Sequence, residues 1–445
     1  MSDETESTLE RETMRKVGMR LLPFLFVLFV FNFVDRSNVA LAALQMNRDL
    51  RFSASAFGFG AGIFFIGYAL FEVPSNFMLA RVGARRWIAR IMISWGILAA
   101  AMMFVRTPLQ FYVVRFFLGV AEAGFFPGVV FYLTQWFPAA RRARATSRFF
   151  IALPMSGIFG GFFGGYLLSL DGHLGLHGWQ WLFLVEGLPS VLLGFSVLWY
   201  LTDRPDQAHW LQDDQREWLI DQMKIDQLSM GLVHKMSALD AIKVPLVWIL
   251  AAPYFLMLTA GYGYTFWAPT VIRDTLGTTN SQTGLITASI ACVSMTFMLL
   301  HAANSDRRRE RFYHAALGGV LIAVGFTGAA LLSQPLLRVV FLGMVIIGCN
   351  SMLAPFWCLP STILGGEAAA VGIALINSLG NFGGFIGPYA IGFFKDKTGG
   401  NTGAFLVLAG FGAAMAILCV ALKYTTLSTT SLHPRARLPT AANPA

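Results

Sequence analysis

Four charged residues stand inside long apolar runs. Asp35 and Arg36 occur together in FNFVDRSNVALAAL, and RFFLGVAEAGFFPG contains Arg115 and Glu122. A charge at the centre of a membrane helix costs about 2.5–3.5 kcal/mol on insertion scales, so such residues are usually paired, face a cavity and have a function. Arg115 and Glu122 are two helical turns apart and therefore share a direction. The pattern predicts a polar site in the middle of a membrane protein, with these side chains facing a central cavity.

The formal charges of these two acids and two arginines cancel, and this favours a site that takes up an anion together with a proton. An added carboxylate would make the site negative, and a net charge is costly in a low-dielectric interior. Protonation of an acid restores neutrality, and burial favours the neutral form of an acid. We therefore expect Asp35 and Glu122 to carry protons, and Arg36 and Arg115 to bind a carboxylate through the guanidinium fork. The alternative is that both pairs only bridge neighbouring helices.

Two further segments contain residues that interrupt regular helix, Gly and Pro in the first and two Pro in the second, as expected where helices line a substrate path. GYGYTFWAP lies within 246–271 and PFWCLP within 336–363, while GIALINSLGNFGGFIGP places two asparagines four residues apart on one face. Additional pocket residues are therefore predicted at Tyr68, Tyr264, Trp267, Trp357, Asn377 and Asn381. Two more acids within apolar runs, Glu72 and Glu186, are expected to have structural or gating roles.

The elements that must position these residues are membrane helices. A bilayer core needs about 20 apolar residues as helix, and twelve such runs occur, at roughly 19–44, 54–80, 87–105, 108–135, 146–170, 179–202, 246–271, 282–303, 312–333, 336–363, 370–394 and 402–424. The predicted fold is all-α and polytopic. It has a six-helix half at 1–202, a polar linker at 203–245, and a six-helix half with a tail at 246–445.

Composition agrees with this class of protein. Of the 445 residues 56% are hydrophobic and only 13% are charged, against about a quarter charged in soluble proteins. The net charge of +9 is concentrated in the termini, the linker and the turns after even-numbered helices. Positive residues favour the cytoplasmic side, so both termini are predicted to be cytoplasmic. The basic charge then faces anionic lipid, and a nucleic-acid partner is not indicated.

Several other classes of function find no support in the sequence. The cysteines Cys292, Cys349, Cys358 and Cys419 lie within apolar runs and form no C-x-x-C, so neither a disulfide framework nor a zinc site is expected. The charged start of the chain is not a cleavable signal peptide, and the first span is expected to direct insertion. There is no phosphate-binding loop for ATP, no enzyme motif, and no cofactor or metal is predicted.

The chain resembles the anion:cation symporter family of the major facilitator superfamily, over essentially all of 20–425. The resemblance rests on DRSNVALAAL, YALFEVPSN, RVGARRWIARIM, RFFLGVAEAGFFPG, GWQWLFLVEGLPSVLLG and INSLGNFGGFIGP. The branch with tartrate and 4-hydroxyphenylacetate permeases is the most similar in appearance. The resemblance implies proton symport of an organic acid by alternating access, by a monomer, in a bacterial cytoplasmic membrane.

The resemblance also implies roles for individual residues. It assigns proton coupling to Asp35 and Glu122, and substrate binding to Arg36 and Tyr68. The loop motif G-x-x-x-D-R-x-G-R-R of the superfamily implies gating by basic turns, here represented by Arg81, Arg85, Asp306 and Arg307. The first copy departs from the motif at Asn76 and Ala80, which puts its charge latch in doubt, whereas the second keeps Asp306 and Arg307.

The sequence leaves the substrate open. FFIALPMSG, at 149–157, is apolar and favours an aromatic or less hydroxylated acid, because each buried substrate hydroxyl needs a partner. The overall resemblance favours tartrate or a sugar acid. Export or exchange of organic anions is the alternative on the same fold. A carboxylate sensor is a third possibility, but 203–245 is short for an output domain.

Overall fold

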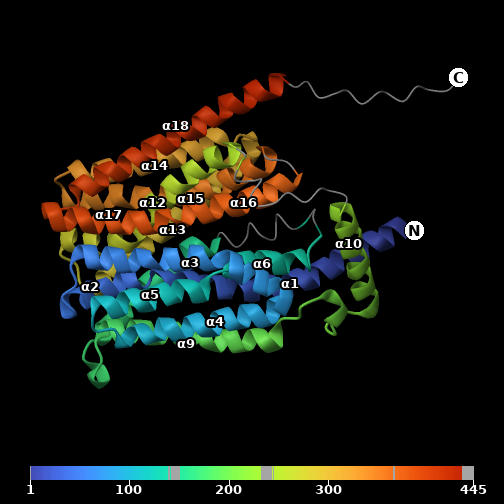
Figure 1. Cartoon of the computed structure of the whole chain (residues 1–445), viewed down its shortest axis with the longest axis horizontal. Coiled ribbons are helices and arrows are strands. Elements are labelled where there is room, and N and C mark those ends of the chain that lie inside the picture. The colour runs from blue at the N-terminus through green and yellow to red at the C-terminus, as the bar shows by residue number, and fades with distance from the viewer. Residues whose placement is uncertain are drawn as a thin grey trace.

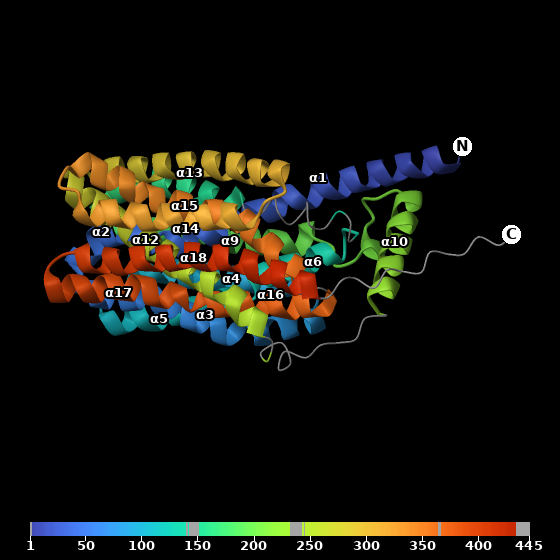
Figure 2. The ribbon, with the colours of Figure 1, turned by 90° about the horizontal axis from the view of Figure 1, so that it is seen from above.

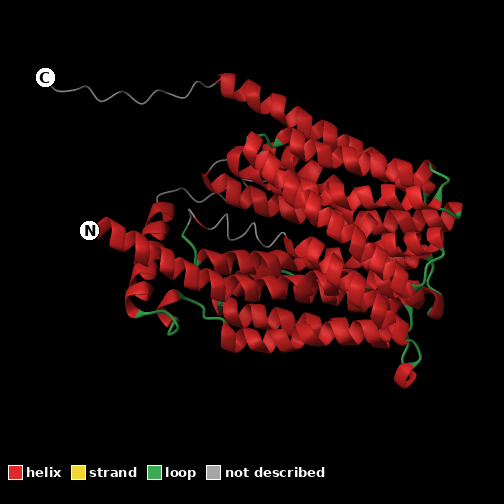
Figure 3. Cartoon of the chain, turned by 180° about the vertical axis from the view of Figure 1, so that it is seen from behind, coloured by secondary structure: helices red, strands yellow, loops and turns green. Residues whose placement is uncertain are grey.

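The computed structural model describes residues 2–138, 141, 151–231, 243, 245–363 and 366–432. Within these ranges every regular element is a helix (Figure 3). Much of 232–245 in the predicted linker, and the start of the predicted span 146–170, lie outside the described residues.

The helices follow one another in two groups separated by α10 (Asp213–Gly231). The first group is α1 (Ser2–Ser37), α2 (Val39–Asp49), α3 (Ala54–Val82), α4 (Ala84–Ala101), α5 (Pro108–Glu122), α6 (Phe125–Thr134), α8 (Ala152–Leu167) and α9 (Gly178–Tyr200). The second group is α12 (Pro245–Leu276), α13 (Asn280–Arg308), α14 (Phe312–Leu331), α15 (Pro335–Ile363), α16 (Gly366–Asn381), α17 (Gly383–Thr398) and α18 (Thr402–Leu432). Short 3-10 turns occur at Met102–Phe104, Leu168–Leu170, His173–Gly175 and Pro205–Gln207.

Eleven stretches of the described residues are long and apolar enough to cross a membrane. They correspond to the predicted spans except for 370–394, which is divided between α16 and α17, of 16 residues each. The division falls at Phe382, which is followed by two glycines. Glycine has a low helix propensity, which favours an interruption there. The predicted all-α polytopic fold is thus confirmed, with the eleventh predicted span present as two half-helices.

Side-chain caps fix where several of these helices begin. The hydroxyl of Ser53 accepts a hydrogen bond from the amide of Ala56 at 3.1 Å at the start of α3. Thr279 and Gln282 form a reciprocal capping box at the start of α13. Such caps satisfy amide groups that have no partner within the helix, so both helices start at defined residues next to the membrane.

The two groups of helices lie side by side as two bundles, called here the N-terminal and C-terminal halves (Figure 1). Helix α1 begins and α18 ends at the same end of the molecule, and α10 lies across that end in both views (Figures 1 and 2). We call it the α10 end, and the opposite one the far end. The described chain thus starts and ends at one end of the molecule, and the cytoplasmic placement of both termini stays a prediction.

The halves touch closely at the far end, where α3 packs on α17 and α8 packs on α13. A Cβ atom on Gly58 would lie 2.5 Å from the carbonyl oxygen of Pro388, and one on Gly161 would lie 2.8 Å from that of Gly284. Real Cβ atoms do not approach so closely, so the helices meet backbone to backbone. The far end is therefore closed by the packing of small residues.

A carboxylate also joins the halves at the far end. Asp396, in the last turn of α17, accepts hydrogen bonds from the backbone amides of Ala54 at 3.1 Å and Ser55 at 2.8 Å. These amides are the first of α3, where the helix dipole favours a negative charge. Asp396 thus caps a helix of the other half.

Candidate binding site between the two halves

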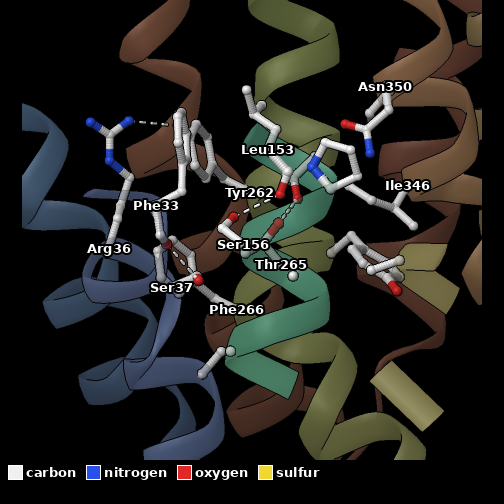
Figure 4. Close-up of a pocket in the computed structure, with 18 of the residues that line it drawn as sticks. Phe33, Arg36, Ser37, Leu153, Ser156, Tyr262, Thr265, Phe266, Ile346 and Asn350 are labelled. Atoms are coloured by element: carbon white, nitrogen blue, oxygen red, sulfur yellow. Dashed lines mark hydrogen bonds between the residues drawn. The ribbon is translucent and has the colours of Figure 1, made fainter. Parts of the chain in front are cut away.

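A cavity of about 230 Å³ lies between the halves. Its walls come from α1, α2, α3, α6 and α8 on one side and from α12, α13, α15 and α16 on the other. Figure 4 shows Arg36 on the wall of the N-terminal half and Asn350 on the opposite wall. The polar side chains along the cavity include Asn32, Asn38, Ser156, Thr265, Thr287, Asn350, Asn377 and Asn381. The cavity suits a small polar molecule that contacts both halves.

Arg36 provides the cavity wall with its positive charge. Its Nε donates to Oε1 of Glu122 at 2.9 Å, and its Nη2 bonds the same oxygen. Its Nη1 donates to the hydroxyl of Tyr262, on α12 of the other half, at 3.1 Å. Glu122 is almost completely buried and does not line the cavity, because Arg36 lies between them. The predicted charge cluster therefore exists as an ion pair whose basic member faces the cavity.

Aromatic rings surround the guanidinium of Arg36. Its Cζ lies 5.1 Å from the ring centre of Phe33, 5.2 Å from that of Phe64 and 5.1 Å from that of Tyr68. Rings at these distances attract a cation through their negative faces, and they restrict the side chain. Arg36 is held in one orientation before any ligand arrives.

Arg115 lies elsewhere than we expected. It shares the N-terminal half with Glu122, but it does not line the cavity. Its Nη2 donates to the carbonyl oxygen of Ala61 on α3 at 3.1 Å, and its guanidinium packs on Phe64 at 4.9 Å. The helical spacing predicts that Arg115 and Glu122 point the same way. The backbone of α3 lies between Arg115 and the cavity, however, and binds its guanidinium. A direct contact with a ligand is not available to it in this conformation.

Asp35 points away from the cavity, into the N-terminal half. Its Oδ2 accepts hydrogen bonds from the indole of Trp95 at 2.9 Å and from the hydroxyl of Ser190 at 2.5 Å. Consecutive residues of a helix are about 100° apart, so Asp35 and Arg36 cannot face the same space. The acid is buried between α1, α4 and α9, one layer behind the cavity.

The remaining predicted pocket residues nearly all line the cavity. They are Tyr68, Tyr264, Trp357, Asn377 and Asn381. Trp267 does not, because its indole donates to the carbonyl oxygen of Pro388 at 2.9 Å within the C-terminal half. The predicted pocket residues are thus brought together around one cavity, except for Arg115 and Trp267.

Glu72 makes a polar contact between the halves. Its carboxyl oxygens accept hydrogen bonds from the amide of Asn377 and the hydroxyl of Ser378, both at 3.0 Å. Glu72 belongs to α3 and its partners to α16. A gating role, as the sequence suggests, fits a carboxylate that holds the two halves together.

The basic turns predicted to act as gates form one ion pair between the N-terminal half and Asp203, the first residue of the linker, and one within the C-terminal half. Arg85 pairs with Asp203 at 3.7 Å and also donates its backbone amide to that carboxylate at 2.8 Å. Asp306 pairs with Arg311 at 2.6 Å. Arg81 packs on Phe77, and Arg307 is exposed. Among the described residues, no hydrogen bond or ion pair of these turns crosses between the halves, so their gating role remains a prediction.

Three helix breaks follow directly on residues of the site. Asn38 separates α1 from α2 just after Arg36, and Gly124, with φ +85°, separates α5 from α6 just after Glu122. The break between α16 and α17 follows Asn381. Of the residues at these breaks, Asn38 lines the cavity, whereas Gly124 and Phe382 do not.

Sequence reasoning missed Tyr262 and Asn350. Tyr262 lies in the same GYGYTF segment as the predicted Tyr264, and the sequence does not say which of the two tyrosines meets Arg36. Asn350, whose amide donates to the hydroxyl of Ser294 at 2.8 Å, is a polar residue inside an apolar run, and that signal could have found it. No cluster of metal-ligating residues occurs in the described part of the chain.

Two helical bundles around a polar cavity, with helices long enough to cross a membrane, define a multi-pass membrane transporter. The chain belongs to the Major Facilitator Superfamily, whose family model matches residues 25–388. It is 45% identical over 419 residues to a protein of Agrobacterium vitis named "Putative tartrate transporter", covering 94% of this chain and 96% of that one. It is 43% identical to the "Putative metabolite transport protein NicT" of Pseudomonas putida, covering 92% and 93% of the two chains.

Solved structures show the same fold at much lower identity. A bacterial homolog of the human lysosomal transporter Spinster, in an inward-facing and unoccupied conformation, superposes with a TM-score of 0.72 at 18% identity. The superposition covers 94% of this chain and 99% of that one. This likeness concerns the fold alone.

Proposed function

We propose that the protein moves an organic carboxylate across the membrane together with protons, by alternating access. The two halves, 1–202 and 246–445, are the bodies that move, and 203–245 links them. The observation that carries the proposal is Arg36, which presents a positive charge to the cavity while its charge is balanced by Glu122 behind it. The relative named as a tartrate transporter supports a carboxylate as the substrate.

The mechanism follows from the geometry of the ion pair. A substrate carboxylate approaches from the cavity and takes the guanidinium of Arg36 as its partner. Glu122 then loses its bonds to Arg36 and is left as a buried charge, which is costly unless it takes up a proton. Substrate binding and protonation of Glu122 therefore favour each other. Release of the proton restores the ion pair and expels the substrate.

Other residues of the site have supporting roles in this proposal. Tyr68, Tyr264 and Trp357 form the walls beside the substrate. Asn377 and Asn381, on α16, offer amides to hydroxyl or carbonyl groups on the part of the substrate that is remote from its carboxylate. Arg115 contributes positive potential without touching the substrate. A small hydroxylated or aromatic carboxylate fits this combination of one cation, amides and rings.

The direction of transport follows from the placement of charge. Lys and Arg residues are concentrated at the α10 end, and positive residues favour the cytoplasmic side. The closed far end then faces outwards in a bacterial inner membrane, and the inward proton gradient drives uptake. Export or exchange of organic anions would use the same residues, driven by a gradient of protons or anions in the opposite direction.

The proposal is tested with the purified protein in lipid vesicles. Tartrate, sugar acids and aromatic acids are supplied outside, and internal acidification and substrate uptake are followed with and without a pH gradient. At least one acid is expected to enter with protons, and Arg36→Ala is expected to abolish binding. Uptake that ignores the pH gradient for every acid would contradict proton coupling. Vesicles loaded with substrate, with the gradient reversed, distinguish export from uptake.

A further inference from the structure

A second pair of carboxyl groups lies behind the cavity, inside the N-terminal half. Glu186, on α9, is 6% exposed, and neither of its oxygens has a hydrogen-bond partner among the described residues. Its electrostatic neighbours are Asp35, a second acid, and the side chain of Asn38. The proposed ion-pair mechanism uses Arg36 and Glu122 and leaves Glu186 without a role.

The surroundings of the pair contain no positive charge to balance two negative ones. Asp35 faces Trp95 of α4 and Ser190 of α9, and both are neutral donors. Glu122 is a further acid that acts on Asp35. No ion pair to Lys, Arg or His involves Asp35 or Glu186 in the described part of the chain. Two neighbouring buried acids cannot both be ionised without a large cost, so the pair holds at least one proton.

The hydrogen-bond pattern indicates which acid holds the proton when the site is empty. Asp35 has two donors on one oxygen, and these stabilise its ionised form. Neither oxygen of Glu186 accepts a hydrogen bond of ordinary geometry, so no donor would stabilise the negative charge of its ionised form. Of the two acids, Glu186 is therefore expected to hold its proton more tightly, because only Asp35 has donors of ordinary geometry on its carboxyl group.

A short route connects this pair with the cavity. Asn38 lines the cavity and is also next to Glu186. It lies where α1 passes into α2, and its backbone keeps helical geometry there, with its amide bonded to the carbonyl oxygen of Val34 at 2.8 Å. On the α8 side, a Cβ added to Gly164 would lie 3.5 Å from Oε1 of Glu186, so only a glycine faces the carboxyl there. Asn38 is thus the side chain that separates the acid pair from the cavity.

We propose that Glu186 is a second proton-binding residue of the transport cycle, which exchanges a proton with Asp35 and reaches the cavity past Asn38. This inference rests on the proposed carboxylate–proton transport. In each cycle the proton enters or leaves as H⁺ through the cavity, and no covalent bond other than the carboxyl O–H is formed or broken.

The test compares Glu186→Gln with Glu186→Asp and the unchanged protein in lipid vesicles, with a substrate found in the screen above. Glu186→Gln keeps the size of the side chain but cannot titrate. We expect it to keep substrate counterflow, which needs no net proton movement, while the number of protons moved per substrate falls and the pH dependence of uptake changes. Glu186→Asp is expected to restore both. A purely structural role would leave the proton number and the pH profile of Glu186→Gln unchanged, and that result would overturn the inference.

A measurement on the unchanged protein covers the case in which Glu186→Gln does not fold. Dicyclohexylcarbodiimide is an apolar reagent that modifies protonated carboxyl groups, and mass spectrometry of the α9 peptide detects the product. We expect modification of Glu186 that decreases as the pH is raised, and absence of modification at every pH would contradict the inference. The two proposals fail separately: if the unchanged protein moves no protons with substrate, the proposed function is wrong, whereas coupled uptake that is identical in Glu186→Gln removes only the role of Glu186.

Discussion

The guanidinium of Arg36 is bonded to both halves of the molecule at once, to Glu122 in its own half and to the hydroxyl of Tyr262 in the other, at 3.1 Å. The residue that we propose to bind the substrate therefore also links the two bodies that must move. Substrate binding and the relative position of the halves are coupled through one side chain.

Within the described part of the chain, Tyr262→Phe removes the only hydrogen bond of Arg36 to the C-terminal half. A hydrogen bond to a charged group contributes about 1.5–3 kcal/mol, so the transport rate is expected to fall by roughly tenfold or more, while the amount of protein in the membrane is unchanged. Initial rates of uptake in vesicles measure the effect. Tyr166→Phe, at an exposed position of α8, is the matched control. Equal rates for the two variants would show that the contact has no part in transport.

Arg36→Lys keeps the charge at the cavity but loses the planar fork. Lysine cannot bond Glu122 and a substrate carboxylate in the same two-pronged geometry. We expect the substrate affinity to weaken by about tenfold to a hundredfold, in line with the loss of one or two charge-assisted hydrogen bonds. Binding isotherms with the substrate of the vesicle screen give the value. Arg86→Lys, at an exposed turn, should bind normally, and normal binding by Arg36→Lys would remove Arg36 from the contact.

Glu122→Gln is expected to make substrate affinity independent of pH. In the unchanged protein, a proton on Glu122 releases Arg36 for the substrate, so affinity should rise as the pH falls, by up to about tenfold per pH unit. Glutamine is already neutral and leaves Arg36 free at every pH. The dissociation constant across a pH series is the measurement, with Glu217→Gln on the exposed face of α10 as the control. A pH dependence that persists in Glu122→Gln would assign the coupling proton to another residue.

Asp396→Ala is expected to weaken the closure of the far end. Partial burial acts to raise the pKa of Asp396, but hydrogen bonds from Ser55, Ala54 and Ser53 outweigh it, and the pKa lies below the usual value for aspartate. A lowered pKa means that the carboxylate stabilises closure above its ordinary pKa and loses this effect only as the pH falls through the lowered value.

Loss of a cap of this kind costs about 1 kcal/mol, so the ratio of closed to open far end should fall by about fivefold. Distances between spin labels placed on the far-end turns of the two halves report this ratio. Asp171→Ala removes a carboxylate at the same end whose partners, the amide of Gly178 and the ring of His177, belong to the same half, and it should leave the ratio unchanged. A ratio in Asp396→Ala equal to that of the control would show that the cap does not hold the halves together.

Gly161→Ala tests the backbone contact between α8 and α13. The added methyl group would lie 2.8 Å from the amide nitrogen of Ala288, so the helices must separate. The far end should then open, and uptake should fall steeply because the closed state is part of the cycle. Gly410→Ala is the control, because nothing lies within 4 Å of its added methyl group. Wild-type uptake by Gly161→Ala would mean that the contact is not needed.

The sequence predicted the membrane helices and most of the cavity, because hydropathy and the cost of buried charge act locally. It did not predict which way Asp35 and Arg115 turn. Helical spacing fixes the angle between residues of one helix, but not the rotation of that helix against its neighbours. That rotation depends on close contacts such as that of Gly119, whose added Cβ would lie 2.9 Å from the carbonyl carbon of Phe64. The pairing of Arg36 with Tyr262 depends in addition on how two separate bundles meet, which no single span encodes.

The meeting of α8 with α13 through Gly161, Gly165 and Gly284 has one more consequence. Two surfaces with interlocking long side chains can separate only after those side chains change rotamer one after another. Two helices in backbone contact can instead separate as rigid bodies. The contact between α8 and α13 should therefore open in a single concerted step, and the height of its barrier is set by how many atoms lose contact at the same moment, not by the flexibility of any particular residue.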